Sequence, residues 1–313
     1  MNTTLPFNDY GSLMRQRLGG RVQKIAIDAA LSCPNRDGKI AYGGCTFCLN
    51  EAFSPSYCHT QHSITEQINS GINFHLSRGR SAQHYIAYFQ SGTNTYANIN
   101  HLKSLYDEAI SHPKISGLII GTRPDCISSE ILDILADIAT HKYVAIEYGI
   151  ESVVDKTLHH VNRGHTFADA ILATRLTRER NIDVGAHFIL GLPEESLEQM
   201  VEQTQVINSL GLNFIKFHQL QIYHTTPMAE EWTMHPERFA LNNISANEYS
   251  ELMVEIVRRL NPNTAIERFA SQAPRHLLLH SPLKGIRIDV LRQMITSRLM
   301  ELHATQGDKL TSK

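Results

Sequence analysis

Three cysteines lie close together in the first part of this sequence, at Cys33, Cys45 and Cys48. Their loop reads Cys-Pro-Asn-Arg-Asp-Gly over residues 33–38 and Gly-Gly-Cys-Thr-Phe-Cys over residues 43–48. Three thiolates can ligate three irons of a cubane [4Fe–4S] cluster and leave the fourth iron open. That open iron could hold a substrate or cofactor through its amino and carboxylate groups. The loop is therefore a candidate iron–sulfur site.

Two other kinds of site compete with this interpretation. Structural zinc also favours a Cys-x-x-Cys pair, and Cys58 or His59 could complete its four ligands. A thioredoxin-like redox pair at Cys45 and Cys48 would need no metal and no third cysteine. The cluster explains more, because neither rival requires the further polar residues that the predicted fold brings to the same rim.

Short apolar, β-branched runs alternate with segments of helical spacing along the chain. The predicted strands are Val22–Ala29, Tyr85–Gln90, Gly117–Arg123, Tyr143–Ser152, Val184–Pro193 and Phe214–Tyr223. The predicted helices are Ile64–Ser77, Ile99–Ser111, Ser129–His141, Phe167–Arg180, Leu197–Leu210 and Asn247–Leu260. This alternation predicts an α/β fold with a parallel sheet. Six units fit a partial (β/α)6 TIM-type barrel better than a full barrel of eight.

In such barrels the chemistry lies at the carboxyl ends of the strands. The residues expected at that rim are the cysteine loop, Gln90–Thr93, Thr122–Asp125, Glu147–Glu151, Gly191–Pro193 and His218–Gln219. Their convergence at one rim carries more weight than any single motif. No linker divides the chain. We expect a core barrel over residues 1–270, including a short N-terminal extension, and a basic helical C-terminal extension over residues 271–313.

Composition and charge narrow the cellular setting. The 313 residues are 42% hydrophobic and 19% charged, without an apolar run of about 18 residues, so we expect no membrane span. Residues 1–20 lack the apolar core of a signal peptide, which predicts a cytoplasmic protein. Between Arg258 and Arg298, eight Lys or Arg residues face two carboxylates in a chain of net charge −2. This segment is either a phosphate-binding face or a solvated helix pair.

Taken together, these motifs resemble the radical S-adenosylmethionine (SAM) superfamily. The match is closest to YhcC/YtqA-type proteins, which are relatives of the radical SAM subunit of Elongator, an enzyme that modifies the wobble uridine of tRNA. The resemblance rests on the cysteine loop, on Gly-Thr-Arg-Pro-Asp-Cys at 121–126, on Asn-Arg-Gly-His at 162–165 and on Gly-Leu-Pro at 191–193. The eleven-residue gap between Cys33 and Cys45 suits this subgroup. The similar region runs from about Phe7 to Pro282.

The resemblance implies a role for each motif. Cys33, Cys45 and Cys48 would ligate the cluster, and the partners would be SAM, a one-electron reductant such as a flavodoxin or a ferredoxin, and tRNA. The residues expected to contact SAM are Phe47, Gln90, Ser91, Gly92, Glu147, Glu151, Arg163, His187, Gly191, Leu192 and Pro193. Among them Arg163 would bind the methionine carboxylate, for which a guanidinium is well suited. Glu151 departs from the glutamine common in relatives, and an ionised Glu can only accept hydrogen bonds.

Several residues keep alternative interpretations. Arg163 could lie on the surface after a helix, and His165, His187 and His218 could be structural histidines. Cys126 is either a buried thiol or a hydrogen donor to a substrate radical, and Cys58 is expected to be a bystander. Three functions stay open: a radical SAM enzyme acting on RNA, one acting on a small metabolite or a protein, and a zinc-stapled binding module without turnover.

Overall fold

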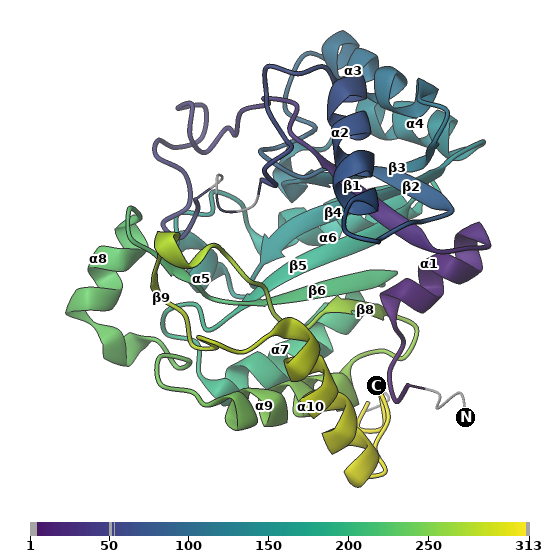
Figure 1. The fold of residues 1–313 in the computed structure, drawn as a ribbon. Coiled ribbons are helices and arrows are strands. Elements are labelled where there is room, and N and C mark those ends of the chain that lie inside the picture. The colour runs from purple at the N-terminus through teal and green to yellow at the C-terminus, as the bar shows by residue number, and fades with distance from the viewer. Residues whose placement is uncertain (1–4, 50–51, 53, 311–313) are drawn as a thin grey trace.

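Seven parallel strands form one curved sheet, a half-barrel that runs through the middle of the molecule (Figure 1). The computed structural model describes residues 5–49, 52 and 54–310. The strands in sheet order are β1 (Val22–Ile27), β2 (His84–Phe89), β3 (Ile115–Thr122), β4 (Tyr143–Glu151), β5 (Asp183–Leu190), β6 (Phe214–Gln219) and β8 (Ala265–Arg268). The predicted partial barrel and its six strands are confirmed.

The structure adds two strand pairings that the sequence did not predict. The four-residue strand β8 extends the sheet beyond β6, and it is too short to show an apolar alternation of its own. The predicted sixth strand stops at Gln219, and its last two residues form β7 (Ile222–Tyr223), which pairs antiparallel with β9 (Leu278–His280).

All six predicted helices are present on the outside of the sheet. They are α2 (Ile64–Leu76), α3 (Ile99–Ser111), α4 (Ser129–Ala139), α6 (Phe167–Arg178), α7 (Leu197–Ser209) and α9 (Ala246–Arg259). Four of them begin at capping boxes, in which a Ser or Thr and the residue three positions later satisfy each other's backbone N–H groups. The remaining α-helices of the described residues are α1 (Tyr10–Leu18), α5 (Asp155–His160), α8 (Pro227–Met234) and α10 (Ile288–Glu301).

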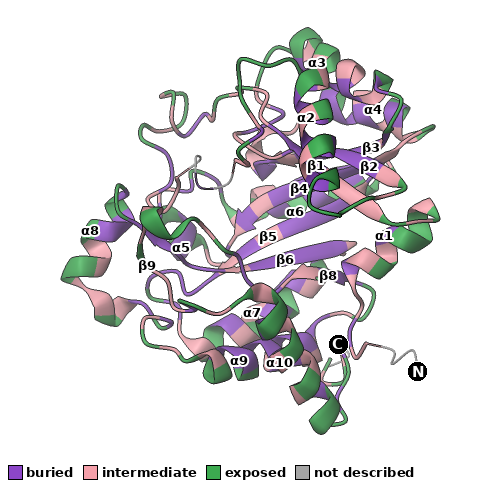
Figure 2. Ribbon diagram, in the orientation of Figure 1, coloured by how far each residue is buried: buried purple, intermediate pink, exposed green. Residues whose placement is uncertain are grey.

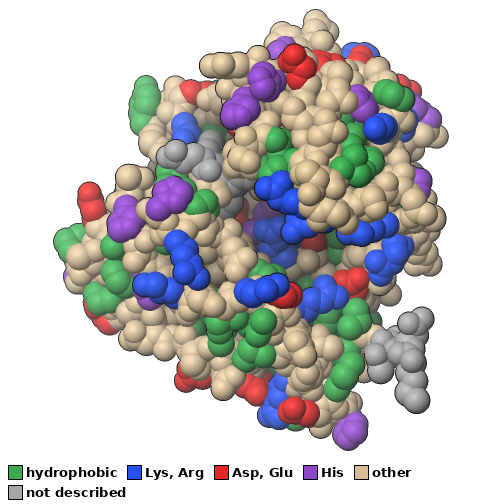
Figure 3. All heavy atoms as spheres, viewed as in Figure 1, with side chains coloured by type: hydrophobic (Ala, Val, Ile, Leu, Met, Phe, Trp, Pro, Cys, Tyr) green, Lys and Arg blue, Asp and Glu red, His purple; other side chains and the backbone are tan. Residues whose placement is uncertain are grey.

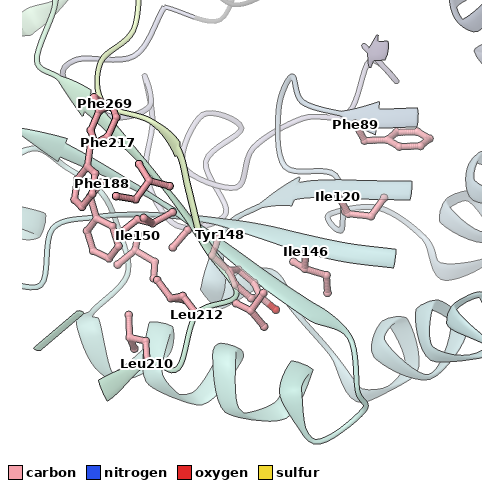
Figure 4. Packing of buried hydrophobic residues seen from close by; sticks show 14 of the residues in the cluster. Phe89, Ile120, Ile146, Tyr148, Ile150, Phe188, Leu210, Leu212, Phe217 and Phe269 are labelled. Carbon is pink, nitrogen blue, oxygen red and sulfur yellow. The ribbon is translucent and has the colours of Figure 1, made fainter. Parts of the chain in front are cut away.

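The alternation of side chains along β4 separates the core from the barrel interior. Ile146, Tyr148 and Ile150 are fully buried between the sheet and the helices (Figure 4), and Figure 2 shows that the central strands of the sheet are mostly buried. Because successive side chains of a strand point to opposite faces, Glu147 and Glu151 point into the barrel instead. Tyr148 reaches α6, where its hydroxyl lies 2.7 Å from Thr177 Oγ1. The outer face thus supplies stability, at about 1.5–3 kcal/mol per large buried side chain, and leaves the inner face for polar groups.

The chain termini cover the open side of the half-barrel between β1 and β8. Asn8 accepts a hydrogen bond from Ile266 N–H of β8 at 2.8 Å, and Tyr10 of α1 packs against Phe214. The C-terminal α10 packs on α9 and is tied to the N-terminal segment, since Arg292 Nη2 lies 2.7 Å from Asp9 Oδ1. The division of the chain at residue 270 stays a prediction. None of the described helices combines the length and apolar character that a membrane span requires.

A buried ion-pair network joins the two edges of the sheet across the barrel. Lys24 Nζ on β1 lies 2.6 Å from Glu267 Oε2 on β8 and 2.7 Å from Glu147 Oε1 on β4. Lys216 Nζ on β6 lies 2.6 Å from Glu147 Oε2 and 3.4 Å from Glu267 Oε1. Two lysines therefore neutralise two glutamates inside the barrel. Removing one member of such a group is costly, because it leaves a buried charge without compensation.

We expect Lys24→Met to lower the melting temperature of the protein by roughly 6–10 °C, since breaking a buried pair costs about 3–5 kcal/mol. The matched control is Arg175→Ala, which removes a solvated pair with Glu179 on the surface of α6. Such exposed pairs contribute about 0–1 kcal/mol. Anaerobic thermal unfolding of both variants provides the measurement, and equal shifts would contradict a stabilising role for the network.

Candidate active site

One cavity of about 590 Å³ occupies the inside of the half-barrel, and residues from all seven strands of the sheet line it. Figure 3 shows this face hollowed between two helical layers, with Lys and Arg side chains gathered around the hollow. Cys33, Cys45 and Cys48 all line the cavity. So do eight of the predicted SAM-contacting residues: Phe47, Gln90, Ser91, Gly92, Glu147, Glu151, Arg163 and His187.

The Gly-Leu-Pro segment after β5 does not line the cavity. Leu192 packs in an apolar cluster with Val161 and Met228, and a Cβ on Gly191 would come within 2.7 Å of the Leu241 side chain. Ile189, two residues earlier on β5, lines the cavity instead. Sequence reasoning missed Ile189, although its position two residues after His187 on the same strand places both on one face.

Nitrogen donors lie near two of the three sulfur atoms of the cysteine loop, those of Cys45 and Cys48. Arg163 Nη1 lies 3.6 Å and Asn35 Nδ2 3.7 Å from Cys45 Sγ. Arg36 Nη2 lies 3.5 Å from Cys48 Sγ and also donates to the Cys48 carbonyl oxygen at 3.3 Å. Hydrogen bonds to ligand sulfur atoms are a feature of iron–sulfur sites, where they tune the reduction potential. The loop is therefore suited to hold thiolates.

The two other cysteines stand outside this group. Cys58 donates its thiol hydrogen to the Ala26 carbonyl oxygen at 3.0 Å, and burial raises its pKa to about 12. Burial and the nearby Asp125 carboxylate likewise raise the pKa of Cys126 to about 12. Among the described residues, neither of these cysteines nor His59 lines the cavity. The cysteines that line the cavity are thus the three of the loop, and three thiols match a cluster with one open iron.

The segment Val161–Gly164 braces the cysteine loop. Thr46 N–H donates to the Val161 carbonyl oxygen at 3.0 Å, and Asn162 Nδ2 donates to the Gly44 carbonyl oxygen at 2.8 Å. Gly164 has a φ of +74°, and a Cβ there would come within 2.5 Å of Asn35 Oδ1. The Asn-Arg-Gly-His motif therefore holds the loop from behind, a role that the sequence alone did not suggest.

Arg163 is buried between a thiol and a carboxylate, not exposed on the surface. Its Nη2 donates to the Gly149 carbonyl oxygen at 2.6 Å and lies 3.7 Å from Glu151 Oε1. Although burial alone would lower the pKa of Arg163, Cys45 and Glu151 more than offset it, so the guanidinium stays charged. Glu151 has a φ of +72°, and a Cβ on Gly149 would lie 2.6 Å from its Oε1. The irregular backbone of β4 at this point places the Glu151 carboxylate beside the Arg163 guanidinium.

The end of β2 approaches the cysteine loop closely. Thr93 N–H donates to the Ser32 carbonyl oxygen at 3.2 Å, and Ser91 Oγ lies 2.9 Å from Ser54 Oγ. Gly92 has a φ of +77°, and a Cβ there would stand only 2.3 Å from the Leu31 carbonyl oxygen. A glycine at this position is therefore needed both for the backbone conformation and for the contact.

Glu147 lies deep in the barrel, with no exposed side-chain surface. Besides the two lysines, His187 Nε2 lies 2.8 Å from its Oε2. Burial would raise the pKa of Glu147, but Lys216 and Lys24 hold it well below its ordinary value. Burial lowers the pKa of Lys216 to about 8. Sequence reasoning missed both lysines and Glu267, although a charged residue inside an apolar strand was a usable signal.

An α/β half-barrel with a three-cysteine loop facing its interior is the architecture of a cofactor-dependent barrel enzyme. The chain belongs to the radical SAM superfamily, whose family model matches residues 38–204, and a radical SAM C-terminal domain model matches residues 212–301. Enzymes of this superfamily use a [4Fe–4S] cluster and SAM, and the chain is accordingly a radical SAM enzyme. The three thiols, their nitrogen donors and the adjoining cavity fit these groups.

Proteins similar to this chain occur in bacteria and in archaea. The chain is 37% identical over 273 residues to protein YhcC of Escherichia coli, covering 87% of this chain and 85% of YhcC. It is 30% identical over 278 residues to the uncharacterized protein YtqA of Bacillus subtilis, covering 89% and 85%. The structure of Elp3 from the archaeon Methanocaldococcus infernus has the same fold, with a TM-score of 0.67 at 16% identity over 91% of this chain. The chain spans 64% of that Elp3 chain.

The close contact at Gly92 gives a direct test of how the cysteine loop is held. We expect Gly79→Ala to cost about 1–2 kcal/mol, because its φ of +69° is unfavourable for alanine while nothing lies within 4 Å. Gly92→Ala has the same strain and also drives a Cβ into the Leu31 backbone, so we expect a further 1–3 kcal/mol. Melting temperature and iron content of the two variants should diverge. Equal losses would show that the contact does not position the loop.

Proposed function

We propose that Cys33, Cys45 and Cys48 ligate the cluster and that the cavity beside them binds SAM. The observation that carries this assignment is that all three thiols lie on the wall of one cavity. Two of them also receive a guanidinium N–H, Cys45 from Arg163 and Cys48 from Arg36. When bound and reduced, the cluster supplies the electron that cleaves SAM to methionine and a 5′-deoxyadenosyl radical, which abstracts a hydrogen atom from the substrate.

The surrounding side chains position SAM and keep the site dry. Arg163 is charged and buried, so it is suited to bind the methionine carboxylate. Glu147 and Glu151 would contact the amino group or the ribose, and the backbone of Gln90–Gly92 would meet the amino group. The backbone around Phe47 would face the adenine, and the walls of the half-barrel exclude water from the radical. The placement of adenine against Gly191–Pro193 stays a prediction.

We expect anaerobically prepared protein to be brown and to carry about four irons per chain, as one cubane cluster implies. Alanine at Cys33, Cys45 or Cys48 should remove colour and iron. The matched control is Cys58→Ala, which removes a thiol that donates to the Ala26 carbonyl and should keep the cluster. Iron and sulfide analysis checks this. Loss of the cluster in the Cys58 variant alone would overturn the ligand assignment, and zinc in place of iron would favour the binding-module interpretation.

We further propose that the substrate is RNA, with a tRNA wobble uridine as the first candidate. A second cavity of about 380 Å³ adjoins the first and shares Gln219, Gln221 and Ser271 with it. Arg275, Lys284 and Arg287 line this outer cavity. A basic outer cavity that leads into the catalytic one suits a phosphate backbone whose flipped-out base enters the barrel. The resemblance to the Elongator subunit supports the wobble uridine.

Most of the basic segment between Arg258 and Arg298 is paired with carboxylates. Its arginines within ion-pair distance of a carboxylate, and therefore largely neutralised, are Arg258, Arg259, Arg287, Arg292 and Arg298. Arg268 lies in the inner cavity with the cysteines and not on an outer face. The phosphate-binding group that we propose is therefore smaller than the segment and consists of Arg275 and Lys284.

For location and reductant, we propose the cytoplasm and a flavodoxin or ferredoxin. Three closely spaced thiols in one loop suit a compartment that keeps cysteines reduced.

Replacing Arg275 and Lys284 together with Ser should reduce the slope of log K against log salt for tRNA binding by roughly 1.4–1.8 units, since each phosphate contact contributes about 0.7–0.9. The matched control is the double Ser variant of Lys114 and Arg178, which removes two exposed cations that line neither cavity. Binding across a salt series, with mass spectrometry of tRNA nucleosides from a deletion strain, provides the test. Equal slopes and an unchanged nucleoside profile would leave a small metabolite or a protein as the substrate.

A further inference from the structure

The inner end of the cavity contains one positive charge more than its carboxylates neutralise. The residues of this charged group, which we name the barrel floor, are Lys24, Glu147, His187, Lys216, His218, Glu267 and Arg268, and all of them line the cavity. Lys24 and Lys216 are balanced by Glu147 and Glu267 at 2.6–3.4 Å. Arg268 is the member that this pairing leaves over.

Arg268 differs from the other cavity-lining cations. Arg123 binds Asp125 at 2.9 Å, Arg163 lies beside Glu151, and Arg36 donates to Cys48. Within the part of the chain that the structure describes, Arg268 alone among the cavity-lining Lys and Arg residues has no hydrogen-bond or ion-pair partner. It lies across from Lys216 in the β6–β8 pairing, at the edge of the sheet. A half-buried guanidinium with five N–H donors and no acceptor is a site for an anion.

His218 supplies a second unsatisfied group beside Arg268. Its ring stacks on His187, with 5.3 Å between centroids and 20° between planes, and its Nε2 is buried without a hydrogen-bond partner in the described residues. Burial holds the pKa of His218 well below its ordinary value, and the neighbouring His187 and Arg268 lower this pKa further. A neutral imidazole next to an arginine can donate one N–H to the same anion without adding charge.

We propose that Arg268 and His218 form a subsite for a carboxylate carried by the substrate. A carboxylate has one negative charge, which matches the single guanidinium left over, and its two oxygens match the planar fork of Arg. A phosphate would bring up to two negative charges next to Glu147 and Glu267, and like charges repel in this enclosed space. The subsite rests on the proposed function only in taking this cavity as the place where the substrate reacts.

This subsite would select the substrate and hold it in the barrel. A bidentate contact deep in the cavity holds one end of the substrate in place. The same C–H bond of the substrate therefore always faces the radical. Such fixing matters because a primary carbon radical is unselective and positioning alone decides which hydrogen is taken. The subsite applies equally to RNA and to a small molecule, provided that the part entering the barrel carries a carboxylate.

The test uses propionate as the probe and propionamide, its neutral isostere, as the control ligand. SAM-loaded, cluster-loaded protein is titrated with each at constant ionic strength, and the rise in melting temperature gives the apparent Kd. We expect propionate to stabilise the protein and propionamide not to. Arg268→Gln should weaken propionate binding roughly ten- to a hundredfold, the loss of a charge-assisted hydrogen bond, while Arg268→Lys should lose less. Iron content and the ligand-free melting temperature report whether each variant is folded.

Each alternative outcome contradicts the proposal in a recognisable way. Equal stabilisation of the wild type and Arg268→Gln would place the propionate elsewhere. Tighter binding of inorganic phosphate than of propionate would exclude a carboxylate subsite. Binding only when SAM is absent would assign Arg268 and His218 to SAM, and no binding by the wild type would remove the subsite. None of these results depends on RNA binding or on turnover, so they do not affect the proposed function.

Discussion

The Glu147 carboxylate connects its own strand, β4, to three others, β1, β5 and β6. Lys24, Lys216 and His187 bind its two oxygens, and through Glu267 the network joins β1, β4, β5, β6 and β8. A closed barrel would join β1 to its last strand by backbone hydrogen bonds, whereas here β1 and β8 do not pair with each other. Burying ions is expensive, and replacing a whole buried network with apolar residues is often neutral for stability. The network is thus better explained by what it does to the cavity than by net stability.

The cavity is polar because of this network. Its walls are held in place because the opposite face of the same strands is packed against helices. On β4, Ile146, Tyr148 and Ile150 are packed against helices, so Glu147, Gly149 and Glu151 have little freedom to move. The cysteine loop is not part of the sheet and is held from outside. It depends on contacts from three separate segments: Val161–Gly164, Gly92, and Met228 of α8, whose N–H donates to the Thr46 carbonyl oxygen at 3.0 Å. Strand packing and loop bracing are therefore independent requirements for one site.

The sequence predicted those features whose signal is local. Six strands and six helices followed from periodicity, and the cysteine loop from spacing. The strand β8 has too few residues to show a period, and the network that ends on it joins residues as distant as Lys24 and Glu267. The same limit applies to Arg163: its residue type suggested a carboxylate partner, but its contacts with Cys45 and Gly149 depend on how two loops meet. Pairings of this kind are determined by the three-dimensional packing of the whole chain.

The basic segment shows most clearly that the net charge of a segment does not determine which of its charges a ligand can reach. The excess of positive charge between Arg258 and Arg298 is real in the sequence, yet its partners Asp9, Glu251, Glu255 and Asp308 come from outside or alongside that segment. Paired surface charges contribute little beyond a Debye length of about 8 Å at physiological salt. What a substrate meets is the remainder: Arg275 and Lys284 at the outer cavity, then Arg268 at the inner one. These three cations lie along the two adjoining cavities, so an anionic ligand would meet positive charge first at the outer cavity and again beside the barrel floor.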